Sequence, residues 1–119
     1  MDTKAIAKAF TELCAKGEYD HAGQQFWSDD VVSKEAGEGD MAVLKGRKAV
    51  VGKGEWWYAN NTVHSAKVEG PYVSGDQFVV RFTFDLTPKG GQRHTMDEVG
   101  IYTVKNGKIV EESFLYHTA

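Results

Sequence analysis

Apolar residues follow two different spacings along the chain, one before about residue 61 and one after it. In the first part, apolar side chains recur every three or four positions, which is the spacing of one face of a helix. In the second part, apolar and polar residues alternate, which is typical of strands with one buried face. Helices first and strands afterwards predict an α+β fold in which helices cover one face of an antiparallel sheet.

Three helices are expected in the first half of the chain. Their bounds are 3–16, 19–27 and 46–61, and a short strand over 31–35 lies between the second and the third. Gly17 stops the first helix, and Ser28-Asp29-Asp30 breaks the second. Gly52 and Gly54 weaken the helical pattern of the third, because glycine is a poor helix former.

The second half of the chain is expected to form a four-stranded meander. Turn signals at Gly70-Pro71, Ser74-Gly75-Asp76, Pro88-Lys89-Gly90-Gly91 and Asn106-Gly107 separate strands over about 62–73, 77–87, 92–104 and 108–117. Side chains two positions apart share a face of a strand. In the second of these strands that face carries Phe78, Val80, Phe82, Phe84 and Leu86. This face is therefore expected to meet the helices.

Composition narrows the class of protein. The 119 residues, 41% hydrophobic and 26% charged, are ordinary for one globular domain, which we expect to span 1–119. The formal charge of −3 and scattered Lys and Arg argue against a nucleic-acid partner. No run of ~18 apolar residues and no leader-like N-terminus is present, so we expect a cytoplasmic protein with no membrane contact. Cys14 lies on an apolar helix face and is expected to pack in the core.

A cavity is expected where the helices cross the sheet, because a curved sheet leaves a hollow there and such hollows usually hold ligands. The ligand-binding residues that we expect in its walls are Trp56, Phe82, Phe84, Tyr102, Glu112, Phe114 and Tyr116. His64 and Glu98 are candidate catalytic residues, because a histidine among carboxylates can act as an acid/base unit. A register slip of one residue would turn Glu98 and Glu112 to solvent. Of the adjacent residues Trp56 and Trp57 on the third helix, only one can point into the cavity.

Other kinds of site find little support in the sequence. His64, His94 and His117 do not show the His-x-His or His-x-x-x-His spacing of metal ligands, so we expect no metal and no other cofactor. The segment Gly52-Lys53-Gly54 is too short for a phosphate-binding loop. No serine lies in a Gly-x-Ser-x-Gly setting that would activate it as a nucleophile.

Four strings carry a resemblance to a known superfamily. They are Phe26-Trp27-Ser28-Asp29-Asp30-Val31-Val32, Gly46-Arg47-Lys48-Ala49-Val50, Gly75-Asp76-Gln77-Phe78-Val79-Val80-Arg81-Phe82 and Gly100-Ile101-Tyr102-Thr103-Val104-Lys105-Asn106-Gly107-Lys108-Ile109. In this order they resemble the nuclear transport factor 2-like (cystatin-like) superfamily and its SnoaL-like group. The resemblance implies a cone-shaped fold with three N-terminal helices packed on a strongly curved, mostly antiparallel sheet. It also implies a conical cavity and, in many relatives, a homodimer formed through the outer sheet face.

The resemblance does not imply one activity, because relatives include isomerases, cyclases, dehydratases, hydrolases and non-enzymatic adaptors. Carried over by position, the general base of the ketosteroid isomerases falls on Glu35, five residues after Asp29-Asp30. Their two oxyanion donors fall on Phe10 and Gly100, which can donate no side-chain hydrogen bond. The largest electrostatic contribution to enolisation would then be missing, so ketosteroid isomerase activity itself is not expected.

Two hypotheses on function stay open at this point. In the first, the cavity binds a small, mostly apolar or aromatic molecule and performs acid/base chemistry of isomerase, cyclase, dehydratase or hydrolase type. Glu35 is then the base, with His64 or Glu98 as its partner. In the second, the protein is a non-catalytic small-molecule binder or a dimeric interaction module. Val79, Val99, Ile101 and Leu115 would lie exposed on the outer sheet face of a monomer, and such a patch predicts a homodimer.

Overall fold

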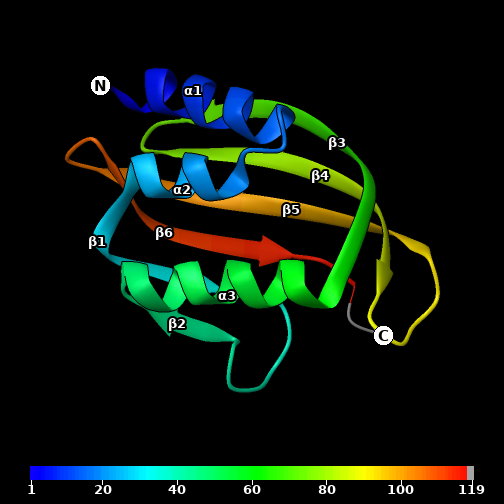
Figure 1. Ribbon diagram of the computed structural model, residues 1–119. Helices are drawn as coiled ribbons and strands as arrows, with labels where there is room; N and C mark the ends of the chain where they lie inside the picture. Colours follow the sequence, from blue (N-terminus) through cyan, green and yellow to red (C-terminus); the bar gives the residue numbers. More distant parts are fainter. Residues whose placement is uncertain (118–119) are drawn as a thin grey trace.

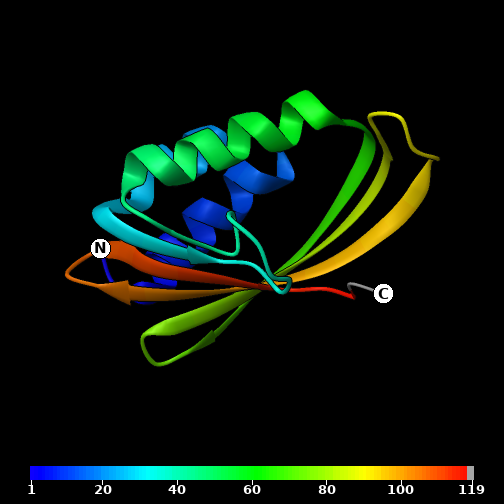
Figure 2. The ribbon, with the colours of Figure 1, turned by 90° about the horizontal axis from the view of Figure 1, so that it is seen from below.

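The computed structural model describes residues 1–117, which form three helices over one face of a curved, six-stranded sheet (Figures 1 and 2). In chain order the elements are α1 (Thr3–Ala15), α2 (Tyr19–Phe26), β1 (Trp27–Lys34), β2 (Val43–Lys45), α3 (Arg47–Asn60), β3 (Asn61–Ser74), β4 (Gln77–Pro88), β5 (His94–Lys105) and β6 (Lys108–Leu115). The predicted α+β cone-shaped fold is therefore confirmed.

The strand order in the sheet is β2-β1-β6-β5-β4-β3. Every neighbouring pair is antiparallel except β1 and β6, which run parallel. The four strands β3 to β6 form the predicted meander, joined by short turns. The early strand β1 packs beside the last strand, β6, so two segments far apart in the sequence lie side by side in the sheet.

The core lies between α1, α2 and the inner face of the sheet. The carboxylate of Asp2 accepts a hydrogen bond from the Ala5 amide (2.8 Å) and caps α1. The alternating apolar side chains of β4 are all buried, as their spacing predicts; they are Phe78, Val80, Phe82, Phe84 and Leu86. Across from them, α1 buries the face that carries Ile6, Phe10 and Cys14.

The main differences from the prediction concern β1, β2 and the end of β6. Trp27 does not end α2 but begins β1, with extended backbone angles (φ −66°, ψ 137°) and a parallel pairing with Ile109. The expected break at 28–30 lies within this strand, in an irregular stretch between the paired residues Trp27 and Val32. The three-residue β2 was not expected, and β6 ends at Leu115 rather than at residue 117.

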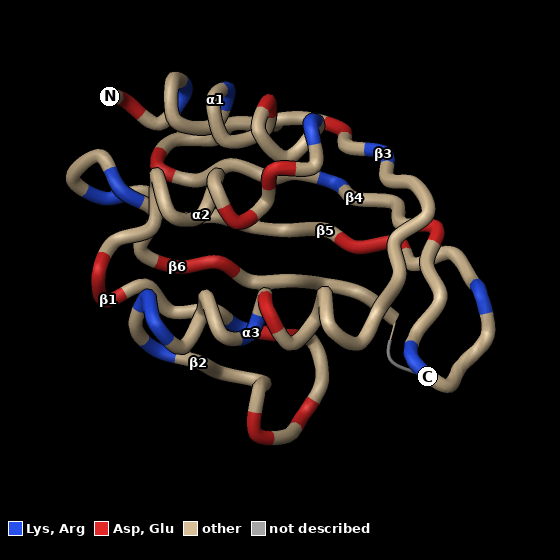
Figure 3. Tube along the Cα trace, in the orientation of Figure 1, with Lys and Arg blue, Asp and Glu red and all other residues tan. Residues whose placement is uncertain are grey.

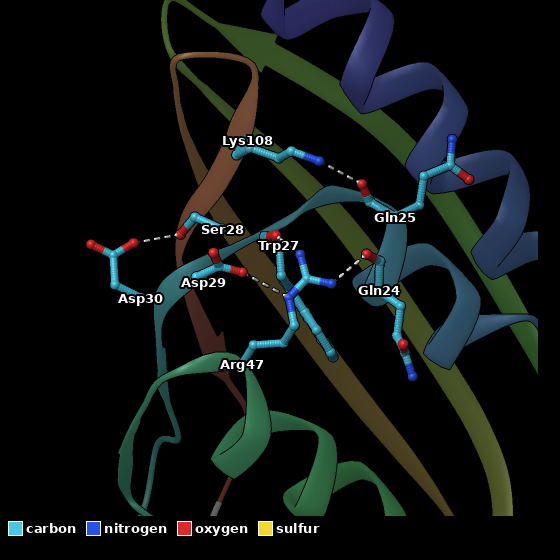
Figure 4. Close-up of polar contacts among 8 residues, drawn as sticks. All are labelled: Gln24, Gln25, Trp27, Ser28, Asp29, Asp30, Arg47 and Lys108. Atoms are coloured by element: carbon cyan, nitrogen blue, oxygen red, sulfur yellow. Dashed lines mark hydrogen bonds and ion pairs between the residues drawn. The ribbon is translucent and has the colours of Figure 1, made fainter.

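A set of polar contacts fixes α3 against the junction of α2 and β1 (Figure 4). The Arg47 guanidinium donates a hydrogen bond to the Gln24 carbonyl (2.7 Å) and another to the Trp27 carbonyl. Lys108 donates to the neighbouring Gln25 carbonyl (3.1 Å). These contacts satisfy carbonyl groups at the end of α2, where the helix leaves them without partners. They therefore hold Trp27 at a defined place beside the cavity described below.

Charged residues are distributed over the whole molecule (Figure 3). Lys and Arg lie singly or in pairs on α1, α3, β4 and the turn between β5 and β6, and they form no continuous stripe along one groove of the described residues. Within residues 1–117, none of the helices combines the length and the apolar character that a membrane crossing requires.

Candidate active site

A cavity of about 460 Å³ lies between the helices and the inner face of the sheet. Its walls come from all three helices, from β1 and from the three strands β4, β5 and β6, and the loop over 37–42 also borders it. Most of this lining is apolar or aromatic. A cavity of this size and character suits a small organic molecule.

Most of the residues expected in the walls border this cavity. They are Glu35, Trp56, Phe82, Phe84, Glu98, Tyr102, Glu112, Phe114 and Tyr116. The register of the sheet explains why the two carboxyl groups on the strands point inward. Glu98 pairs with buried Phe82 on β4, and Glu112 pairs with buried Tyr102 on β5 and with buried Ser33 on β1. Glu98 and Glu112 therefore lie on the inner face of the sheet, as the alternation of side chains along their strands predicts.

His64 lies outside the cavity, contrary to the sequence-based placement. The register of β3 against β4 shifts here, with Val63 opposite Leu86 and Ser65 opposite Asp85. This irregularity interrupts the alternation, so His64 does not share the inner face as simple counting predicts. Its Nε2 lies 2.7 Å from the Thr87 hydroxyl, in an exposed position. The structure therefore does not bring His64 together with Glu35 or Glu98.

The two adjacent tryptophans of α3 both border the cavity but differ in burial. Trp57 is half-buried, packs against the core, and has its ring centroid 5.4 Å from that of Phe84. Trp56, the residue expected in the wall, is 53% exposed. Trp57 is therefore the one that forms part of the inner wall, and Trp56 lies where the cavity meets solvent.

Glu112 is a buried carboxyl group with both oxygens bonded. Its Oε1 accepts a hydrogen bond from the Trp27 indole (2.7 Å), and its Oε2 accepts one from the Ser33 hydroxyl (2.8 Å). The pKa of Glu112 is raised above its ordinary value, because burial raises it more than Lys53 and the two donors lower it. A Cβ atom at Gly23 would lie 2.3 Å from the Trp27 ring, so the missing side chain makes room for this indole. Gly23 thus allows Trp27 to reach Glu112.

Lys53 joins two of the carboxyl groups, and sequence reasoning missed this role. Its Nζ donates hydrogen bonds to Glu35 Oε1 (2.7 Å) and to Ser33 Oγ (2.5 Å), and it lies 4.9 Å from the centroid of the Phe114 ring. Ser33 in turn donates to Glu112. The signal in the sequence was the spacing of Lys53 from Val50 on the buried helix face, because residues three apart lie on one side of a helix.

The pKa of Glu98 lies well above the ordinary value of a glutamate. Burial, and next the negative charge of Glu35, raise the pKa of Glu98 to about 8, although Lys53 opposes this shift. Glu98 is therefore mostly neutral at pH 7 and can donate a hydrogen bond. Glu35 instead forms an ion pair with Lys53 in which both side chains are largely shielded from solvent. Burial and the charge of Glu35 also raise the pKa of Tyr116 to about 12, so its hydroxyl keeps its proton.

Together these groups can perform proton transfer in an apolar setting. Glu35 offers a carboxylate, and Glu98 offers a carboxylic acid, within the same cavity. Two carboxyl groups held in different protonation states are the usual requirement for an acid and a base at one site. Among residues 1–117, no three side chains of His, Cys, Asp or Glu come close enough together to hold a metal ion.

A family of known proteins matches this chain over nearly all of its length. The model of the SnoaL-like domain matches residues 1–116. The protein in one crystal structure, from Mesorhizobium loti, is 56% identical to this chain. It is provisionally named a SnoaL-like polyketide cyclase, and the name carbohydrate phosphatase is added in brackets. It superposes with a TM-score of 0.95, over 98% of this chain and 100% of that chain. No match was found among curated proteins.

More distant structures share the fold. An NTF2-like protein of unknown function from Burkholderia xenovorans LB400 is 17% identical, with a TM-score of 0.72 over 98% of this chain and 84% of that one. A provisionally named polyketide cyclase from Pseudomonas putida KT2440 is 16% identical, with a TM-score of 0.72 over 98% of this chain and 92% of that one.

Proposed function

Because the chain belongs to the SnoaL-like domain family, we propose that it catalyses an acid/base reaction on a small, mostly apolar carbonyl compound. Glu35 is the general base and Glu98 is the acid. One observation carries this proposal: a carboxylate held by Lys53 and a half-buried, neutral carboxyl group border the same apolar cavity. Two similar structures carry provisional names as polyketide cyclases, in keeping with a carbonyl substrate.

The reaction proceeds through an enolate. Glu98 donates a hydrogen bond to the carbonyl oxygen, and Glu35 takes a proton from the adjacent carbon. The electrons of that C–H bond form a C=C bond, and the carbonyl oxygen takes up the negative charge. In a β,γ-unsaturated substrate, the dienolate receives the proton from Glu35 at the γ carbon and the carbonyl group re-forms, which isomerises the substrate. Alternatively, the enolate carbon attacks a second carbonyl carbon, whose oxygen takes up the proton from Glu35, and this closes a ring. An apolar, water-poor site strengthens the hydrogen bond to the developing oxyanion.

Turnover assays with enolisable ketones and polyketide-like lactones test this proposal. We expect Glu35→Gln to lower kcat by at least ~100-fold, which is the usual contribution of a positioned general base. In the unmodified protein, we expect activity to fall above about pH 8, where Glu98 loses its proton. Glu98→Gln keeps a donor in place, so it should lower kcat less than Glu35→Gln does and should remove this fall. The control is Glu111→Gln, because Glu111 pairs with Lys34 outside the cavity. An activity that Glu35→Gln leaves intact would contradict the role of Glu35.

A second candidate function is non-catalytic binding of the same class of molecule. It is favoured by Phe10 and Gly100, which stand where the resemblance to ketosteroid isomerases implies two oxyanion donors. Calorimetry with small aromatic ketones separates the two candidates. Tight binding without any product would favour a carrier or sensor, whereas product formation that depends on Glu35 favours the enzyme.

A further inference from the structure

We propose that Tyr102 donates the second hydrogen bond to the enolate oxygen, beside Glu98. This inference rests on the proposed function and deepens it, because an enolate oxygen held by one donor lacks much of the stabilisation that two aimed donors supply. Tyr102 borders the cavity, on the strand that also carries Glu98.

The position of the Tyr102 hydroxyl follows from the absence of a side chain at Gly100. Glu98, Gly100 and Tyr102 alternate along β5 and therefore share its inner face. A Cβ atom at Gly100 would lie 2.7 Å from the Tyr102 hydroxyl oxygen and 2.9 Å from two atoms of the ring. The ring is thus folded back over Gly100, along the strand in the direction of Glu98. The two donors then lie on one stretch of the cavity wall.

Packing holds the Tyr102 ring in this place. Its centroid lies 4.9 Å from that of Phe78, with the two rings nearly parallel (17°), and 4.7 Å from that of Phe10. The residue is only 2% exposed. A donor that is fixed before the substrate arrives does not have to be reoriented during the reaction, which is the condition for strong oxyanion stabilisation.

The hydroxyl is also in the right chemical state to donate. Burial, and then the neighbouring negative charges, raise the pKa of Tyr102 well above its ordinary value, so it stays protonated at neutral pH. Its partner across the sheet, Glu112, accepts its hydrogen bonds from Trp27 and Ser33 instead.

Kinetics provide the first test. Tyr102→Phe removes one oxygen and keeps the stacked ring, so the fold is expected to survive. We expect kcat to fall by about 100-fold with little change in KM, because a donor that acts on the oxyanion stabilises the transition state more than the bound substrate. The matched control is Tyr72→Phe, since Tyr72 is 60% exposed and does not border the cavity. This control should keep full activity.

Binding provides a second test that needs no turnover. The probe is 2-naphthol, whose phenolic oxygen resembles an enolate oxygen, with naphthalene as the counterpart that lacks this oxygen. We expect the unmodified protein to bind 2-naphthol more tightly than naphthalene. Tyr102→Phe should weaken the binding of 2-naphthol about 10-fold, the effect of one hydrogen bond worth ~1.4 kcal/mol, and leave naphthalene binding unchanged. Gly100→Ala should do the same by displacing the hydroxyl, provided its melting temperature shows a folded protein.

The outcomes separate this inference from the proposed function. Turnover that depends on Glu35 but not on Tyr102 would overturn the inference and keep the function. A lack of turnover together with 2-naphthol binding that depends on Tyr102 would overturn the catalytic function and keep the donor. Equal binding of 2-naphthol by the unmodified protein and by Tyr102→Phe, or no measurable binding at all, would overturn the role of Tyr102.

Discussion

Lys53 borders the cavity together with the carboxyl groups of Glu35, Glu98 and Glu112. Replacing this lysine is the most informative test of what stabilises the site. We expect Lys53→Met, which keeps most of the side-chain volume, to destabilise the protein. The Glu35 carboxylate would lose its partner at 2.7 Å, and Ser33 would lose a donor. Glu98 and Glu112 would lose the positive charge that lowers the pKa of each.

The expected size of this loss follows from the burial of the ion pair. The Lys53 side chain is 13% exposed and that of Glu35 is 24% exposed. Breaking a fully buried pair costs about 3–5 kcal/mol, whereas an exposed pair contributes about 0–1 kcal/mol. We therefore expect a decrease of about 2 kcal/mol in the free energy of unfolding at pH 7. Because protonated carboxyl groups no longer need a cation, the decrease should become smaller toward pH 4.

Urea denaturation at pH 7 and at pH 4 measures both quantities. Lys34→Met is the matched control, because the Lys34–Glu111 pair has a similar length (2.8 Å) but both side chains are far more exposed (49% and 39%). We expect this control to lose less than about 1 kcal/mol at either pH. Equal losses for Lys53→Met and Lys34→Met, or a loss that does not depend on pH, would refute the reasoning.

Three further predictions concern protonation, assembly and thiol reactivity. The pKa of Glu98 is raised from 4.5 to about 8 in the folded state, so the folded protein holds a proton that the unfolded chain releases, and stability should fall as pH rises through this window. Glu98→Gln should flatten the decrease of the melting temperature between pH 5 and pH 8, and an unchanged slope would contradict this. We propose a homodimer through the outer sheet face, where Val79, Ile101 and Ser113 pair in one row beside exposed Leu115. Sedimentation should show that Ile101→Lys converts a dimer to a monomer, and an unmodified protein that is a monomer at every concentration would contradict this. Burial raises the pKa of Cys14 to about 12, so a thiol-reactive disulfide reagent should label it only after unfolding, and fast labelling of the folded protein would disprove its burial.

The alternation of apolar residues was sufficient to predict the four-stranded meander from β3 to β6. In β4 every second residue is apolar, so one face had to be buried, and the pairing with β5 then placed Glu98 and Tyr102 on that same face. The end of α2 was harder to predict, because the string from Trp27 to Asp30 has the residues of a helix stop. The strand begins at Trp27 because Ile109 on β6, about 80 residues later, pairs with this residue, and no local pattern contains that information.

The site could be predicted only in part, for a related reason. Glu35 was found through the resemblance, and Glu98 and Glu112 through strand alternation. The ion pair of Lys53 with Glu35 depends on how α3 lies against β1, which the weak apolar pattern of this glycine-containing helix does not determine. His64 was misplaced because an irregularity within β3 changes the side to which it points.

The parallel pairing of β1 with β6 has a consequence for how the chain folds. The bonds from Ser33 and Trp27 to Glu112 span 79 and 85 residues, respectively. During synthesis, β1 can pair with β2 early, but its second neighbour, β6, and the Glu112 carboxyl group become available only about 80 residues later. Contacts between distant parts of a chain form slowly, because closing a long loop costs entropy before any contact compensates for it. The cavity is thus expected to be completed late in folding, when β6 inserts between β1 and β5.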